Sequence, residues 1–87
     1  MDAGYQRIFN VMNINDAIKI LKEKVTDKYA QEYLKNLPIA IDEGGTRGLC
    51  VQLCYILENS KTWRGKEASS TKKFIKEWIA GKEKILE

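Results

Sequence analysis

Two short turns in the C-terminal half of the chain carry residue types suited to binding an anion. The first, GGTRG, places Gly45, Thr46 and Arg47 just before an apolar helical stretch. Backbone amides at a helix N-terminus attract a phosphate, glycine lets it approach the backbone, and Arg47 adds a planar pair of donors. The same residues also suit plain helix caps, with Gly44 ending one helix and Thr46 beginning the next.

The second turn, TWRGKE, combines an aromatic ring with cations at Trp63, Arg64 and Lys66. Such a ring can stack on a base while the cations hold a phosphate. The alternative is that the tryptophan closes the end of the core. If the helices on either side are antiparallel, the two turns lie at opposite ends of the intervening helix, about 20 Å apart by helix rise. One small ligand then cannot touch both turns within a monomer, and only a homodimer or an extended ligand would join them.

Catalysis and metal binding are disfavoured by the residues available. The chain has no histidine and two cysteines, Cys50 and Cys54, so one chain cannot supply a tetrahedral zinc site. Both thiols lie in the most apolar run of the sequence, where we expect them to be buried, reduced and unreactive. We therefore expect no catalytic residue, no metal ligand and no cofactor.

The elements that position these turns are helices. Apolar residues recur at helical spacing, and no alternating strand pattern of useful length is present, so the sequence predicts an all-α fold, a small four-helix bundle with short connections. The expected helices run from the Asn13 cap to about Val25, from Thr26 or Asp27 to Gly44, from Thr46 to Asn59, and from between Thr62 and Lys66 to a C-cap at Gly81. Residues 82–87 then either trail off or add one turn. The expected core comprises Leu21, Leu34, Leu49, Cys50, Leu53, Ile56, Leu57, Ile75 and Trp78.

Pro38 interrupts the second of these helices. Proline removes a backbone donor and restricts the residue before it, so we expect a break near Asn36 and Leu37, with a kinked continuous helix as the alternative. The third helix, Thr46–Asn59, is apolar nearly all round, which is typical of a helix buried on most sides.

Length and charge limit the remaining possibilities. The 87 residues form one domain, residues 1–87, in which residues 1–12 are an extension that either docks Phe9 on the bundle or frays. Residues 1–43 hold six Lys or Arg against seven Asp or Glu, whereas residues 44–87 hold nine against five. The positive half favours phosphate-bearing or acidic partners. No stretch suits a membrane span or a leader, so we expect a cytoplasmic protein that does not engage membranes.

At LPIAIDEGGTRGL and LENSKTWRGKEA the chain resembles short, uncharacterised all-helical accessory proteins encoded by phages and prophages. The two segments cover less than a third of the chain, and the resemblance carries no activity and no residue role. It implies a setting, since small phage proteins of this kind often block a host factor or sequester a nucleotide signal used in defence.

Two functional hypotheses follow, both for a small non-enzymatic binding protein that forms a homo-oligomer. In the first, the protein captures a phosphate-bearing ligand, either a nucleotide signal or a nucleic acid. The ligand-binding residues are then Gly45, Thr46, Arg47, Trp63, Arg64 and Lys66. In the alternative, the protein is an inhibitor or adaptor, for example in phage counter-defence, that binds another protein through an exposed helix face.

Overall fold

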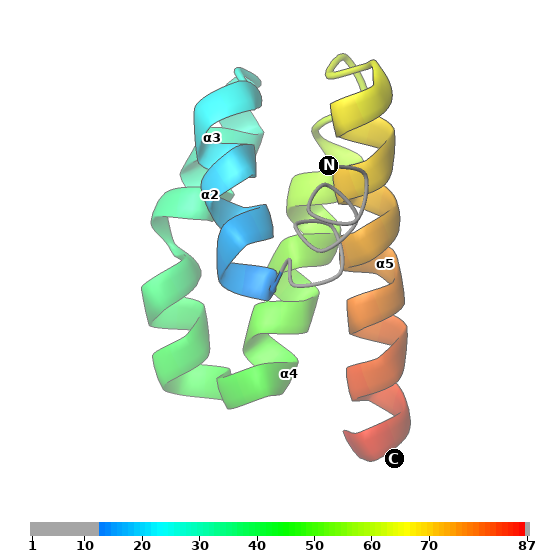
Figure 1. Ribbon diagram of the computed structural model, residues 1–87. Coiled ribbons are helices and arrows are strands. Elements are labelled where there is room, and N and C mark those ends of the chain that lie inside the picture. Colours follow the sequence, from blue (N-terminus) through cyan, green and yellow to red (C-terminus); the bar gives the residue numbers. More distant parts are fainter. Residues whose placement is uncertain (1–12, 87) are drawn as a thin grey trace.

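The computed structural model describes residues 13–86, with side chains as far as Glu83, and shows an all-α bundle (Figure 1). Within that range the chain forms four helices and no strand: α2 (Ile14–Lys24), α3 (Lys28–Lys35), α4 (Leu37–Glu58) and α5 (Lys66–Leu86). The predicted fold class is confirmed. The expected extension at residues 1–12, with Phe9, lies outside the described residues.

The first two helices begin at the caps that the sequence indicates. The side chain of Asn13 accepts a hydrogen bond from the amide of Asp16 at 2.9 Å, and the Asp16 carboxylate accepts one from the Asn13 amide at 3.3 Å. Such a reciprocal capping box satisfies two amides that a helix N-terminus otherwise leaves unpaired. Asp27 caps α3 with a single bond, accepting from the amide of Ala30 at 2.9 Å.

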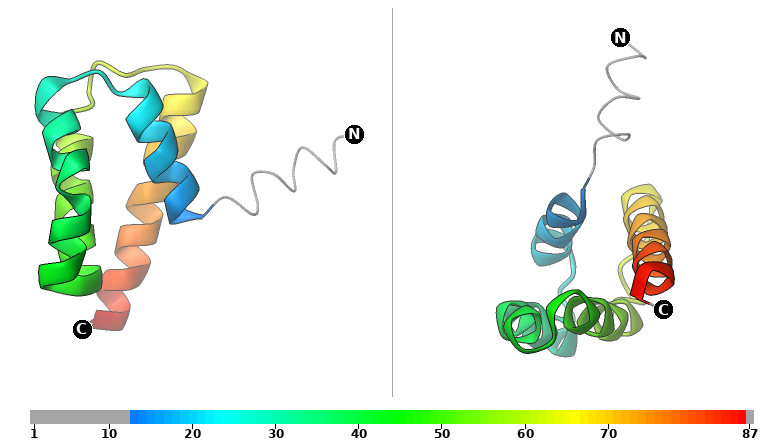
Figure 2. Two further views of the ribbon diagram at one scale, coloured as in Figure 1. Left: turned by 90° about the vertical axis from the view of Figure 1, so that its left-hand side faces the viewer. Right: turned by 90° about the horizontal axis from the view of Figure 1, so that it is seen from below.

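Helix α4 is bent back on itself at Gly45, where the backbone is non-helical with φ 59° and ψ −141°. Only glycine adopts such a conformation without strain. We call residues 37–44 the first arm of α4 and residues 46–58 the second arm. Figure 2 shows the two arms side by side and running in opposite directions. The predicted break is confirmed too, since Asn36 lies in a turn and Pro38 stands in the first turn of α4.

The arms of α4 meet most closely at Gly48, where the second arm passes the backbone of Ala40. A Cβ atom added at Gly48 would lie far inside contact distance of the Ala40 carbonyl oxygen. The side chain of Gln52 then donates to the backbone carbonyl of Tyr33 at 3.1 Å, which joins the second arm to α3. The chain thus rises through α2, descends through α3 and the first arm, rises through the second arm and descends through α5 (Figure 1).

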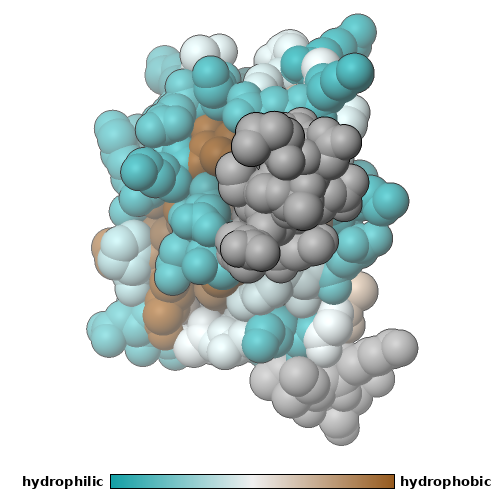
Figure 3. Space-filling model, viewed as in Figure 1, coloured by the Kyte–Doolittle hydropathy of each residue, from teal (hydrophilic) through white to brown (hydrophobic). Residues whose placement is uncertain are grey.

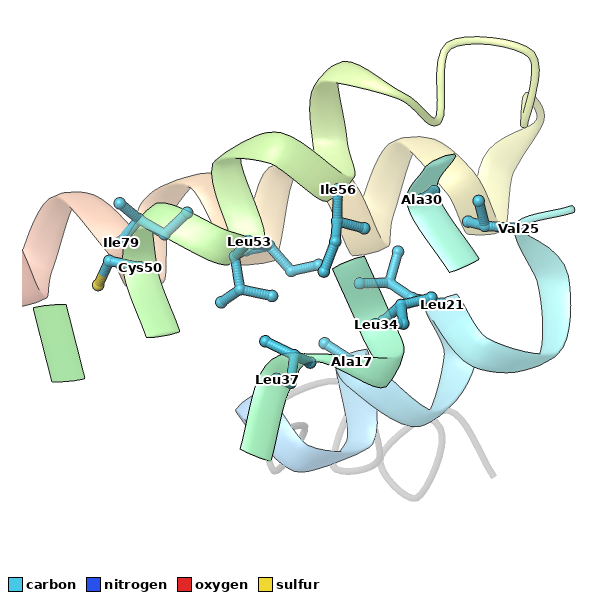
Figure 4. Close-up of a cluster of buried hydrophobic side chains, with 11 residues drawn as sticks. Ala17, Leu21, Val25, Ala30, Leu34, Leu37, Cys50, Leu53, Ile56 and Ile79 are labelled. Atoms are coloured by element: carbon cyan, nitrogen blue, oxygen red, sulfur yellow. The ribbon is translucent and has the colours of Figure 1, made fainter. Parts of the chain in front are cut away.

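The core draws residues from every described helix. Leu21, Leu53, Ile56 and Ile75 are fully buried, and Figure 4 shows several of these side chains converging between α2, α3 and α4. Burying each large aliphatic side chain contributes about 1.5–3 kcal/mol to folding. Of the predicted core, Leu49, Leu57 and Trp78 are only half-buried and pack against this cluster. The cluster also includes residues outside the predicted core, namely Ala17, Val25, Ala30, Leu37 and Ile79.

Two expectations about the helices are wrong. The second arm of α4 is not buried on most sides, because Val51 and Tyr55 are 46% and 48% exposed and Cys54 is exposed as well. Glycine at position 81 does not cap α5, which continues to Leu86, so of the two alternatives for the residues after it the structure shows the added turn. Helices tolerate an exposed glycine at a cost of about 1 kcal/mol relative to alanine. The ammonium of Lys82 lies 5.3 Å from the centre of the Trp78 ring, a contact that supports this extra turn.

Candidate functional sites

The GGTRG turn lies at the reversal between the two arms of α4. Gly45, Thr46 and Arg47 are all exposed there. The chain reversal requires a glycine at position 45, because only glycine adopts this backbone conformation without strain. The glycine of this turn is therefore explained without a bound anion. No hydrogen bond involves the Thr46 side chain within residues 13–83, so the expected hydroxyl cap is not formed.

Most of the TWRGKE turn lies in residues 59–65, which connect α4 to α5. Lys72 holds this connection in place. The ammonium of Lys72 donates to the backbone carbonyls of Ser60 and Trp63, each at 2.7 Å. It also lies 5.7 Å from the centre of the Trp63 ring. Burial lowers the pKa of Lys72, and the neighbouring charges of Lys76 and Arg64 lower it further. This lysine is therefore a fixed cation beside other cations.

Trp63 serves mainly to close the core. It is half-buried and packs against the central cluster, and Lys72 covers one face of its ring. Arg64 and Lys66 are exposed, with Arg64 donating from Nε to the Lys61 carbonyl at 3.5 Å. These two cations remain available to an anion, whereas the indole offers a base much less surface than an exposed tryptophan would.

The structure places the two predicted turns at opposite ends of the second arm of α4 (Figure 1). Gly45, Thr46 and Arg47 lie at one end, and Trp63, Arg64 and Lys66 lie at the other. One small ligand therefore cannot contact both groups within a single copy of the chain. The two turns are separate candidate sites unless two copies associate or an extended ligand spans both.

Two other surfaces were not singled out from the sequence. The first is an apolar surface over α3 and the second arm of α4, formed by Tyr29, Tyr33, Val51 and Tyr55, which we call the tyrosine face. The rings of Tyr33 and Tyr55 stack with their centres 5.3 Å apart. Tyr29 and Val51 lie one helical turn before Tyr33 and Tyr55, respectively, and because α3 and the second arm are antiparallel, they extend the stacked pair in opposite directions. Tyr29 is 66% exposed, which makes it the most exposed large apolar side chain of the described residues.

The second surface is an open groove of about 400 Å³ between the second arm of α4 and α5. One wall of the groove is formed by Cys54, Leu57, Glu58 and Lys61. The other wall is formed by Lys72, Lys76, Ile79, Ala80 and Glu83 of α5. The sequence suggested that Cys54 is buried, but it is exposed in this groove. Cys50, four residues earlier, is buried as expected.

The two thiols differ in accessibility and share a direction of pKa shift. Burial raises the pKa of the Cys50 thiol, and the negative charge of Glu83 raises it further. Partial desolvation in the groove and the carboxylates of Glu83 and Glu58 raise the pKa of Cys54. A thiol with a raised pKa is less ionised at neutral pH and is a poorer nucleophile. Cys54 is therefore accessible without being activated.

Between residues 13 and 86, no group of three or more Cys, Asp or Glu side chains is placed to hold a metal ion. In the same range, none of the helices combines the length and apolar character that crossing a membrane requires. Figure 3 shows a mainly hydrophilic surface with small apolar areas on the side viewed in Figure 1.

No family model matches the chain, and no curated protein or solved structure matches it significantly.

Proposed function

We propose that the protein is a non-enzymatic binding protein that docks another protein on the tyrosine face. The observation that carries this proposal is the stacked pair Tyr33–Tyr55, flanked by a 66%-exposed Tyr29 and a 46%-exposed Val51. Tyrosine is enriched at protein interfaces because it supplies a large, rigid apolar surface and a hydroxyl that can bond at the wet edge. A partner with an apolar helix or loop fits this uncharged surface better than a polyanion does.

The docking geometry is held in place before the partner arrives. The stacking of Tyr33 on Tyr55 and the hydrogen bond from Gln52 to the Tyr33 carbonyl at 3.1 Å fix α3 against the second arm of α4. A surface built on two packed helices loses little conformational entropy on binding, which favours affinity. This agrees with an inhibitor or adaptor that acts through an exposed helix face.

The double variant Tyr29→Ser/Tyr55→Ser is expected to lose partner binding while keeping its fold. Aromatic residues at the centre of an interface each contribute about 2 kcal/mol or more, so the loss in affinity is expected to exceed about tenfold. Co-purification from the producing cells, followed by titration with the recovered partner, measures this loss.

The matched control is Ile39→Ser, which removes an equally apolar, 56%-exposed side chain outside the tyrosine face. It should bind as the parent does. Equal binding by the double variant and the parent contradicts the proposal, as does retention of a nucleic acid rather than a protein.

A second candidate function is capture of a phosphate-bearing ligand at the cationic end of α5. It is favoured by the surroundings of Lys72, whose pKa is lowered by burial and further by the neighbouring charges of Lys76 and Arg64, a charge repulsion that a bound anion would relieve. Arg64 and Lys66 supply exposed donors beside this cluster. If two copies associate with their turns in contact, Gly45, Thr46 and Arg47 of one copy complete the site of the other.

Arg64→Ala and Arg47→Ala test this second function. Each is expected to weaken binding of a nucleotide by more than about tenfold, because a charged hydrogen bond to phosphate contributes about 1.5–3 kcal/mol. Neither substitution removes a buried contact, so the unfolding midpoint should stay unchanged. Titration with a nucleotide panel at low and moderate salt measures the effect, since phosphate contacts weaken steeply with salt. Parent-like binding by both variants, or no binding by the parent, excludes this function.

A further inference from the structure

We propose that the groove between α4 and α5 binds a single-chain amphiphile with an anionic head group, held at Lys72 and Lys76. The groove lies between α4 and α5, whereas the tyrosine face lies over α3 and α4, so this proposal goes beyond the protein-docking function. The volume of the groove, about 400 Å³, is at the lower end of the range found for small-molecule sites.

The anionic head is assigned to the end of the groove near residues 59–65. Lys61, Lys72 and Lys76 all line that end. The ammonium of Lys72 has three N–H donors, of which the carbonyls of Ser60 and Trp63 use two at 2.7 Å. The third donor is held in a fixed position, so an anion accepts from it without the cost of ordering a long side chain.

The carboxylates of the groove leave this end positive. A carboxylate oxygen of Glu58 lies 3.8 Å from the ammonium nitrogen of Lys61, and the two form an ion pair. Among the ion pairs of the described residues, none joins Lys72 or Lys76 to a carboxylate. Glu83 lies seven residues beyond Lys76 on α5, about 10 Å along the helix by its rise. An anion at the far end would be repelled by Glu83, so the charge distribution fixes the direction of the ligand.

The apolar tail is assigned to the floor between these ends. Leu57, Ile79, Ala80 and the thiol of Cys54 line this middle part. The distance of about 10 Å between Lys76 and Glu83 suits an extended chain of about eight carbon atoms. Carboxylate and phosphate heads share the required chemistry, namely an anion on one alkyl chain, and the experiment distinguishes them.

Cys54 provides a local reporter for the test, because it is exposed in the groove while Cys50 is buried. We expect octanoate and octyl phosphate, below their micelle concentrations, to slow alkylation of Cys54 by iodoacetamide. Comparison of the two shows which head group is preferred. Acetate, which lacks the tail, and octyltrimethylammonium, which carries the opposite charge, should leave the rate unchanged.

The matched variants are Lys76→Gln and Lys73→Gln, two exposed lysines of α5 of which only Lys76 lines the groove. Lys76→Gln is expected to raise the octanoate concentration for half-protection by about fivefold or more, and Lys76→Arg to restore it. Lys73→Gln should behave as the parent. The proposal is overturned by a lack of protection with octanoate and octyl phosphate, by equal protection with octyltrimethylammonium, or by parent-like protection in Lys76→Gln. Unfolding by the amphiphile would accelerate alkylation and thus cannot mimic protection.

Discussion

Replacing Gly48 by alanine is expected to destabilise the protein by about 3 kcal/mol. The added Cβ would meet the carbonyl oxygen of Ala40, and the carbonyl carbon lies 3.0 Å from the same position. Both obstacles belong to the backbone, so relief requires the arms of α4 to separate rather than a side chain to rotate. Urea unfolding followed by circular dichroism measures the change.

Two other glycines serve as matched controls. Gly44 and Gly81 have helical backbone and nothing within 4 Å of an added Cβ. Alanine at either position should be neutral or should stabilise by about 0.5–1 kcal/mol, because alanine favours helix over glycine. If Gly48→Ala is as stable as Gly44→Ala, the close crossing of the two arms is wrong.

Truncating Leu53 to alanine is expected to cost about 2–5 kcal/mol. Leu53 is fully buried on the second arm and contacts the central cluster, so the substitution removes apolar burial and leaves a cavity. For a chain of this size a loss of 1 kcal/mol lowers the thermal midpoint by about 4–8 °C. Calorimetry should therefore show a drop well above its error.

Val51→Ala on the same arm provides the control. Val51 is 46% exposed and lies on the tyrosine face, so its truncation should cost less than about 1 kcal/mol. Equal losses for Leu53→Ala and Val51→Ala would contradict the assignment of the buried side of the second arm.

The helix boundaries were largely predictable because they depend on local chemistry. Asn13 and Asp27 carry oxygens that accept from helix amides, and both act as caps. Pro38 restricts its neighbours in any context, and the turn at Asn36 follows. Such signals act within a few residues, so a single sequence contains them in full.

The burial of the second arm of α4 was less predictable because it depends on how many neighbours surround the arm. Val51, Cys54 and Tyr55 are apolar and stand beside Cys50 and Leu53, yet they remain exposed. The arm packs against the first arm and α3 on one side and α5 on another, which leaves its remaining surface open (Figure 2). Hydrophobic periodicity shows which side is most apolar and does not show how many helices cover it.

The two new surfaces could not be found from the sequence because each joins residues from distant segments. The groove brings residues 54–61 against residues 72–83, two segments that are separated in the sequence by the connection between α4 and α5. The tyrosine face depends on the stacking of Tyr33 on Tyr55, which are 22 residues apart. The predicted turns, by contrast, are local in sequence, and the structure places them at opposite ends of the second arm of α4, as expected for antiparallel helices (Figure 1).

Site-specific photo-crosslinking at the tyrosine face tests the central claim most directly. A benzophenone amino acid replaces Tyr29, and the control places it at Glu77, an exposed position on α5. Irradiation of producing cells is predicted to yield one protein adduct of defined mass from position 29 and none from position 77, with the adduct lost in a Tyr55→Ser background. Equal adducts from both positions, an adduct that survives Tyr55→Ser, or an adduct with a second copy of the chain alone would contradict docking of a partner protein on this face.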